Sequence, residues 1–138
     1  MREILFKAKR LDNGEWVEGY YWTNLFNNHF IRIAQDKSGR FTIVDFEIDP
    51  DTLCQFTGLT DRNGNKIWEN DIVNVSDCEW NASGPAGYDS PIVLVEWNEH
   101  NCGFDPFANY DCDCGVYYEA KNTKVIGNKF DNSELLKE

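Results

Sequence analysis

The sequence has 138 residues, 41% hydrophobic and 14% aromatic, which predicts one compact unit or two very small ones with a real core and excludes a disordered chain. Its formal net charge of -11 argues against binding to phosphate backbones. No apolar run approaches the roughly 20 residues of a membrane helix, and residues 1–7 interrupt their apolar side chains with charges, unlike a secretory signal. We therefore expect a cytoplasmic protein.

The charge is uneven along the chain. Residues 1–50 carry seven Lys/Arg and eight Asp/Glu, a net of -1, whereas residues 51–138 carry six and sixteen, a net of -10. No Lys or Arg occurs between Lys66 and Lys121, a span with eleven acids. Such a surface repels nucleic acid and is able to attract a basic partner, although solubility alone also explains it.

Five cysteines occur in the chain: Cys54, Cys78, Cys102, Cys112 and Cys114. An odd number without an export signal argues against a disulfide framework. We expect reduced thiols, some of them buried as small apolar groups.

The first half of the chain predicts two β-hairpins. The expected strands are residues 3–11, 16–22, 30–33 and 41–44. Turn residues follow the first strand and separate the last two, and a polar break lies at residues 24–28. Strict alternation then places four side chains on one strand face: Trp16, Glu18, Tyr20 and Trp22.

After a break around Pro50, the second half predicts shorter strands. These are residues 53–59, 66–68, 71–75, 92–97, 116–118 and 123–128. Residues 80–91 predict a long loop, because they contain Gly and Pro, and residues 98–115 predict an irregular segment. Asn132 or Ser133 is expected to cap a short C-terminal helix.

Three stretches carry a recognisable pattern. The centre reads QFTGL at residues 55–59 and DRNGNKIWENDIV at residues 61–73, the opening reads MREILFKA at residues 1–8, and the closing pattern is VIGN followed by ELL within residues 125–136. Together these stretches resemble the phage and prophage family called YopX. One departure is Asn70, where the family usually has Gly; Asn tolerates the left-handed region, so we still expect a turn there.

The resemblance implies a mostly β fold, with an N-terminal β-hairpin region followed by a small SH3-like barrel and the short C-terminal helix. The implied division is residues 1–48 for the β-rich region and 49–138 for the barrel region, with a long variable insertion at about 76–122. It also implies phage or prophage origin, and it carries no activity that transfers to named residues.

Turn chemistry explains the central pattern without a function. Gly58 and Gly64 suit tight turns, and Asp61 is able to accept hydrogen bonds from amides near Asn63 and Gly64, as Asp71 is at its own bend. The apolar residues of the pattern are expected to pack as a hairpin core: Phe56, Leu59, Ile67, Trp68, Ile72 and Val73. We predict a structural role for the pattern.

His100, Cys102, Cys112 and Cys114 form the one candidate metal cluster, with the donor set that zinc favours. Only one residue separates the ligands within each pair, whereas structural zinc sites more often place them two to four residues apart. Scattered loop and core cysteines are the preferred interpretation, so we predict no metal and no cofactor.

Catalytic signals are sparse, since His29 and His100 are the only histidines and no nucleophile elbow or phosphate loop occurs. We therefore predict that the protein is not an enzyme. Six aromatic residues are candidates for stacking single-stranded nucleic acid: Trp16, Tyr20, Trp22, Trp68, Trp80 and Trp97. Such platforms need a basic groove and basic residues are sparse, so core packing is the better interpretation for most of them.

These observations predict a phage- or prophage-encoded accessory or interaction protein that binds copies of itself or a host or phage protein. The alternative is an acidic decoy that inhibits a nucleic-acid-binding host protein by imitating phosphate charge. A third hypothesis is an enzyme or metal-dependent regulator that uses the cysteines of residues 100–114.

The charge makes one prediction directly. We expect no micromolar binding to duplex DNA at about 150 mM salt, because duplex affinity depends on cations that neutralise phosphates. A gel shift across a salt series tests this, and salt-dependent micromolar binding would contradict it.

Overall fold

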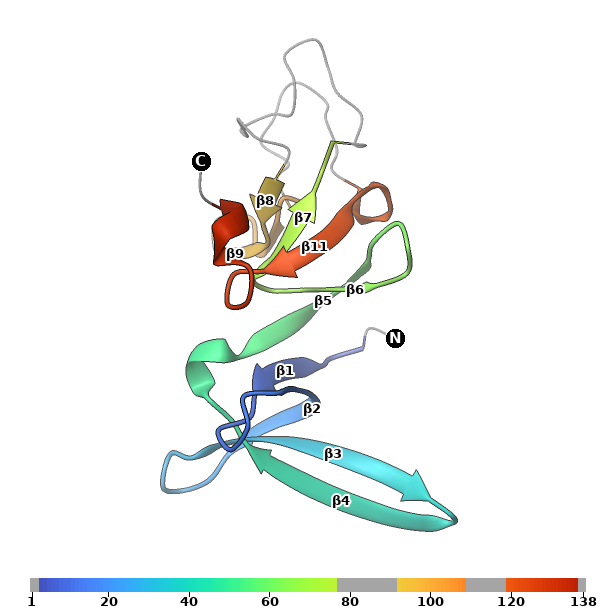
Figure 1. The fold of residues 1–138 in the computed structure, drawn as a ribbon, viewed down its shortest axis with the longest axis vertical. Coiled ribbons are helices and arrows are strands. Elements are labelled where there is room, and N and C mark those ends of the chain that lie inside the picture. The colour runs from blue at the N-terminus through green and yellow to red at the C-terminus, as the bar shows by residue number, and fades with distance from the viewer. Residues whose placement is uncertain (1–2, 77–91, 109–118, 137–138) are drawn as a thin grey trace. The chain divides into compact units, whose positions relative to one another are not determined.

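The computed structural model describes residues 3–76, 92–108 and 119–136 (Figure 1). The chain divides into two compact units, residues 1–56 and 57–138. Antiparallel strands dominate the described residues, and the helical segments there are single 3-10 turns, at Pro50–Thr52 (η1), Ala120–Asn122 (η2) and Ser133–Leu136 (η3). The expectation of a mostly β fold is confirmed. None of the described helical segments is long and apolar enough to cross a membrane.

The first unit is built on one antiparallel sheet. Its strands are β1 (Phe6–Lys9), β2 (Trp16–Thr23), β3 (His29–Lys37), β4 (Arg40–Glu47) and the beginning of β5 (Cys54–Thr60). Within this unit the strand order is β4-β3-β2-β1-β5, so β4 has β3 on one side only (Figure 1). The two predicted hairpins, β1–β2 and β3–β4, are both present.

Local turn residues set the register of the long β3–β4 hairpin. Ser38 and Gly39 both have positive φ, 54° and 75°, as a two-residue type I′ turn requires, and they place Lys37 opposite Arg40. The neighbouring strand β2 changes partner at Gly19, with residues 16–19 facing β1 and residues 20–23 facing β3. A Cβ at Gly19 would lie 2.3 Å from the Arg32 carbonyl oxygen, so this close approach needs glycine.

One face of this sheet carries the core of the first unit. Its fully or nearly fully buried members are Ala8, Val17, Ile31 and Ile48. Partly buried apolar side chains complete it: Phe6, Tyr21, Ile33, Phe46 and Leu53. Ile48 reaches this core through the chain that follows β4, where it forms a bridge with Arg10.

The second unit contains the last residues of β5 and six further strands. They are β6 (Lys66–Trp68), β7 (Asp71–Asn74), β8 (Ile92–Leu94), β9 (Glu96–Asn98), β10 (Gly103–Asp105) and β11 (Lys124–Asn128). β6 neighbours β5, and a three-stranded sheet has the order β11-β7-β8 (Figure 1). β9 pairs with β10. The core lies among Ile67, Val73, Val75, Val93 and Val95, with partly buried Phe104, Phe107, Ala120 and Val125 against it.

Five of the six apolar residues of the central pattern are buried as predicted: Phe56, Ile67, Trp68, Ile72 and Val73. Leu59 is the exception, because 37% of its surface stays exposed near the end of β5. Burial is therefore confirmed for the pattern except at this position, and the core cluster of the second unit contains two of its residues, Ile67 and Val73.

Several finer expectations are not met. The described strands of the second unit form separate small sheets and no closed barrel, and residues 133–136 make a 3-10 turn in place of an α-helix. A single turn this short lacks the length that offsets helix nucleation. The expected strand at residues 116–118 and the expected loop at residues 80–91 lie outside the described residues.

The strand expected at residues 92–97 is divided in two. Val95 follows the end of β8 and exchanges backbone hydrogen bonds with Asn70 and Asp71, each at 2.8 Å. The next residues form β9, which pairs with β10. β10 falls within the segment expected to be irregular. Both differences arise because strand pairing with distant residues, which local pattern does not encode, decides where a short apolar run bends.

Trp68 and Trp97 give a matched test of this core. Trp68 is 5% exposed, whereas Trp97 is 48% exposed on β9. We expect Trp68→Ala to lower the free energy of unfolding by roughly 3–5 kcal/mol, because it empties a filled core site, and Trp97→Ala to cost clearly less. Chemical denaturation of both variants measures this, and equal losses would contradict the assignment of the core.

Candidate functional site

Asp61 is a buried residue of the central pattern, 4% exposed, and it joins two distant chain segments. Its Oδ1 accepts the backbone N–H groups of Asn63 and Asn65, each at 2.9 Å. Its Oδ2 accepts the Val125 N–H at 3.0 Å and the Asn65 side-chain amide at 3.4 Å. The predicted role as acceptor of turn amides is confirmed, and the bond to Val125 also ties the turn to β11.

The protonation state of Asp61 follows from these contacts. Burial raises its pKa, but the donors of Val125, Asn65 and Asn63 outweigh burial and hold the pKa of the carboxyl below its ordinary value. Asp61 is therefore ionised at neutral pH and acts as a saturated acceptor, which suits a structural role and not proton transfer.

Asn70 and Asp71 join three further segments. Asp71 is 3% exposed, and its Oδ2 accepts the Trp68 N–H at 2.8 Å. The Asn70 C=O accepts the Lys129 N–H at 3.0 Å, next to the Val95 contacts described above. Asn70 has a φ of 71°, so the expected left-handed turn is present with Asn in place of the family's usual Gly.

The closing pattern is held by a second set of local contacts. The Asn128 Oδ1 accepts the N–H groups of Phe130 and Asp131, at 3.0 and 2.9 Å, and Asn132 Oδ1 accepts the Asn128 N–H at 3.2 Å. A Cβ at Gly127 would lie 2.5 Å from Asn132 Oδ1. The residues of the closing pattern thus serve local turn geometry.

The candidate metal cluster is described only in part. Cys102 is exposed with a φ of 53°, and its thiol donates to the Glu99 C=O at 3.5 Å. Cys112 and Cys114 lie outside the described residues, so the zinc hypothesis stays a hypothesis. Within residues 3–76, 92–108 and 119–136, no group of three or more His, Cys, Asp or Glu side chains is placed to hold a metal.

The first unit has an outer face, which is the side of β1–β4 opposite its core. The register places on it Lys7, Lys9, Trp16, Glu18, Tyr20, Trp22, Phe30, Arg32, Phe41, Ile43 and Asp45. The expected alignment of Trp16, Tyr20 and Trp22 on one strand face is confirmed. Among the described candidates, core packing is right for Trp68 alone. Trp16, Tyr20 and Trp22 lie on the face opposite the core, Tyr20 and Trp97 are 63% and 48% exposed, and Trp80 lies outside the described residues.

Cations of the same chain lie over the two indole rings of the outer face. Lys7 Nζ is 4.7 Å and Lys9 Nζ 5.4 Å from the Trp16 ring centroid, and the Arg32 guanidinium is 5.0 Å from that of Trp22. Phe30 stacks on Trp22 with the centroids 4.6 Å apart. A nucleic-acid base would have to displace these partners to stack, which disfavours a stacking platform.

Asp45 fixes this arrangement from β4. It accepts the Arg32 Nε–H at 2.9 Å, an Arg32 terminal N–H at 3.2 Å and the Trp22 Nε1–H at 3.0 Å. The Arg32 guanidinium, with help from Trp22, holds the pKa of the Asp45 carboxyl below its ordinary value. Asp45, Arg32 and the Trp22 indole N–H therefore find their hydrogen-bond partners within the same sheet.

The turn between β2 and β3 presents two apolar side chains to solvent, Leu25 at 100% and Phe26 at 86% exposure. We call residues 24–28 the apolar turn. Asn24 holds it through four hydrogen bonds: its Oδ1 accepts from Phe26 and Asn28, its C=O accepts from Asn27, and its N–H donates to Asn28. The sequence marks this segment only as a polar break, since asparagines surround the apolar pair.

β4 presents an open sheet edge. The Leu11 N–H donates to the Glu47 C=O at 3.0 Å, so the backbone of Glu47 points away from β3. The direction of the backbone N–H and C=O groups alternates along a strand. Those of Phe41, Ile43 and Asp45 therefore point the same way as those of Glu47, away from β3. Phe41 is 70% and Ile43 55% exposed, and β3 is the only neighbour of β4 among the described strands.

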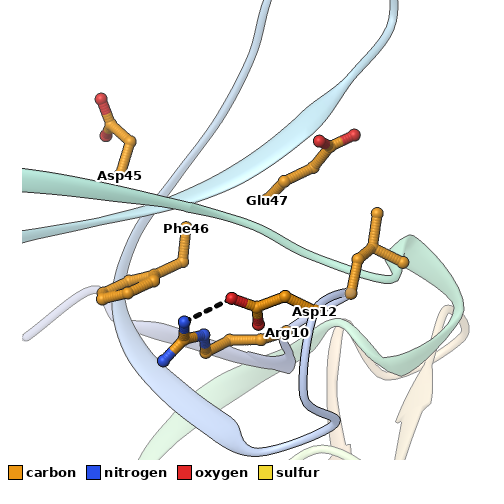
Figure 2. Close-up of a pocket in the computed structure, with 6 residues that line it drawn as sticks. Arg10, Asp12, Asp45, Phe46 and Glu47 are labelled. Carbon is orange, nitrogen blue, oxygen red and sulfur yellow. Dashed lines mark hydrogen bonds and ion pairs between the residues drawn. The ribbon is translucent and has the colours of Figure 1, made fainter.

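A pocket of about 300 Å³ adjoins the end of this edge and is lined by Arg10, Leu11, Asp12, Asp45, Phe46 and Glu47. Figure 2 shows Arg10, Asp12 and Phe46 on one side of β4 and the carboxylates of Asp45 and Glu47 on the other. Arg10 lies 4.3 Å from the Phe46 ring centroid and pairs with Asp12. Because its charged groups do not converge, the pocket has no arrangement that selects a small ligand.

Comparisons with known proteins identify a family and a similar fold. The model of the family described as "YopX protein" matches residues 5–137. The fold is similar to that of protein EF1440 from Enterococcus faecalis, a crystal structure, with a TM-score of 0.56, 22% sequence identity and coverage of 99% of this chain and 100% of that chain. No curated protein matches the sequence. At this identity the structural likeness shows a shared fold alone.

Asp61→Asn tests the segment-joining carboxylate. The variant replaces one carboxylate oxygen with an NH2 group, which cannot accept a hydrogen bond from a backbone N–H such as that of Val125. We expect a loss of roughly 1–3 kcal/mol of unfolding free energy at neutral pH. Because folding lowers the Asp61 pKa, its contribution is present above the ordinary carboxyl pKa and is lost as pH falls through the folded value. The difference between wild type and variant should therefore shrink in acid.

The exposed Asp51→Asn is the control for the loss of one carboxylate and should change stability little at neutral pH. Urea unfolding of the three proteins across a pH series measures these differences. A wild-type advantage over Asp61→Asn that stays constant down to strong acid would contradict the role of the ionised carboxylate.

Proposed function

The chain belongs to the YopX protein family, and we propose that it is a phage- or prophage-encoded accessory protein that acts by binding other proteins and not by catalysis. The partner class is a second copy of the chain or a host or phage protein. The phage assignment rests on the resemblance of the central, opening and closing patterns to that family.

The observation that carries this proposal is the apolar turn. Leu25 is fully exposed and the adjacent Phe26 is 86% exposed, so two large apolar side chains lie in water. This costs free energy unless a partner covers them. The Asn24 hydrogen bonds hold the turn in one shape before binding, so little conformational entropy remains to be lost on association. An aromatic residue on a preorganised turn is a typical anchor of a protein interface.

The acidic-decoy alternative has weaker support. Within the acid-rich span, the described Asp71 is buried and bonded to the Trp68 backbone, and Lys121 pairs with Glu119 at 3.1 Å. These contacts engage two of the described acids, whereas Glu96 and Glu99 are exposed; a decoy needs its acids in an ordered exposed row. The interaction protein is accordingly our preferred function.

The double variant Leu25→Ser/Phe26→Ser tests the proposal with the full chain as bait in a host-lysate pull-down. We expect the variant to melt like wild type, because neither side chain is buried, and to lose a captured protein through a weakening of about 2 kcal/mol or more. Mass spectrometry of the two eluates measures the loss.

Leu135→Ser/Leu136→Ser is a control in the second unit, since it removes two partly exposed apolar side chains, 37% and 40% exposed. It should retain the captured protein. Identical eluates from wild type and the apolar-turn variant would count against the apolar turn as the binding surface. An empty eluate from a wild-type chain that is also monomeric would count against the proposed function.

A further inference from the structure

The edge of β4 lacks the features that usually prevent strand edges from pairing. Its register with β3 runs without a bulge from Lys37↔Arg40 to Phe30↔Glu47, and the strand contains no proline. Sheet edges in monomeric proteins are commonly protected by bulges, prolines or central charges. Here the central residues of the edge are the exposed Phe41 and Ile43, and the only charged residue between Arg40 and Glu47, Asp45, is bonded to Arg32 and Trp22.

The turn after β1 limits how far this edge extends. Because the Leu11 N–H already occupies the Glu47 C=O, an added strand has access to the outward backbone groups only up to Asp45. The type I′ turn at Ser38 and Gly39 limits the other end. The part of the edge that is free to pair therefore runs from about Gly39 to Asp45. Near its centre lie Phe41 and Ile43, whose backbone N–H and C=O groups point away from β3.

We propose that β4 pairs antiparallel with β4 of a second copy of this chain, about a two-fold axis at Thr42. This pairing places Phe41 of each copy opposite Ile43 of the other, with both pairs exchanging backbone hydrogen bonds. It joins the two sheets into one continuous sheet and removes both open edges. The inference rests on the proposed function and names the partner of one of its surfaces.

The accessible length of the β4 edge favours pairing centred on Thr42 over pairing centred on Ile43. A pairing centred on Ile43 would set Phe41 against the carboxylate of Asp45 and would need the Glu47 backbone that Leu11 occupies. Centring on Thr42 matches the accessible length and brings all four exposed apolar side chains to the same face. A two-fold axis makes the segment its own complement, so no other sequence is required.

Ile43→Lys tests the pairing, with Ile4→Lys as a matched control, because Ile4 is 57% and Ile43 55% exposed and both variants add one positive charge. In multi-angle light scattering at high concentration, we expect wild type and Ile4→Lys at twice the chain mass of 16.0 kDa, and Ile43→Lys at 16.0 kDa. Wild type at 16.0 kDa, or Ile43→Lys at the wild-type dimer mass, would overturn the proposal.

A cysteine substitution tests the register. In the proposed pairing Thr42 faces its own copy as a non-hydrogen-bonded pair, about 4.5 Å between Cα atoms, within the range that a disulfide spans. Mild oxidation should crosslink Thr42→Cys above the wild-type level set by the native cysteines, whereas Arg40→Cys, displaced along the strand from its symmetry mate, should not crosslink. A dimer in which Arg40→Cys crosslinks and Thr42→Cys does not would overturn this register.

The two proposals fail separately. Leu25→Ser/Phe26→Ser should remain a dimer, because the apolar turn is not part of the β4 edge. Ile43→Lys should still capture the partner of the apolar turn. A monomeric wild type that nevertheless captures a host protein would refute the β4 pairing and leave the proposed function standing.

Discussion

The second unit depends on one buried negative charge. A carboxylate removed from water must have its oxygens hydrogen-bonded, and Asp61 meets this requirement with donors from its own turn and from Val125, 64 residues away. The neighbouring Arg62 N–H bonds to the Thr123 C=O at 2.9 Å and reinforces the same junction. The turn of the central pattern and the first residues of β11 are therefore joined by one carboxylate and one backbone hydrogen bond.

A similar principle governs the rest of the patterned residues. Asn70 takes a left-handed conformation so that its backbone reaches both Val95 and Lys129, and Gly127 leaves room for Asn132. Each of these positions is chosen by backbone geometry or by the need to satisfy a buried polar group. This explains how a family can be recognised by its sequence pattern although that pattern contains no chemistry of catalysis.

The two surfaces that we propose as binding sites lie in the first unit, at positions that the family-like pattern does not include. The two indole rings of the outer face are engaged within the sheet by Asp45 and by the cations Lys7, Lys9 and Arg32. The apolar turn and the β4 edge differ from this cluster, because Leu25 and Phe26 in the turn and Phe41 and Ile43 on the edge strand are exposed apolar side chains. Both are held rigid, one by Asn24 and the other by an uninterrupted hairpin, which lowers the entropy lost when a partner binds.

Local chemistry made much of this protein readable from its sequence alone. Turn residues and strict alternation were sufficient to predict the β1–β2 and β3–β4 hairpins, the mostly β class, the structural part played by Asp61 and Asp71, and the burial of Trp68, because these features depend on residues a few positions apart. Tertiary structure decided which distant amide meets Asp61, where the run at residues 92–97 divides at Val95, and that Tyr20 faces solvent. It also decided that β4 lies at the edge of its sheet, since strand order depends on which segments pair across long sequence separations, and an alternating pattern is the same for a central strand with one exposed face as for an edge strand.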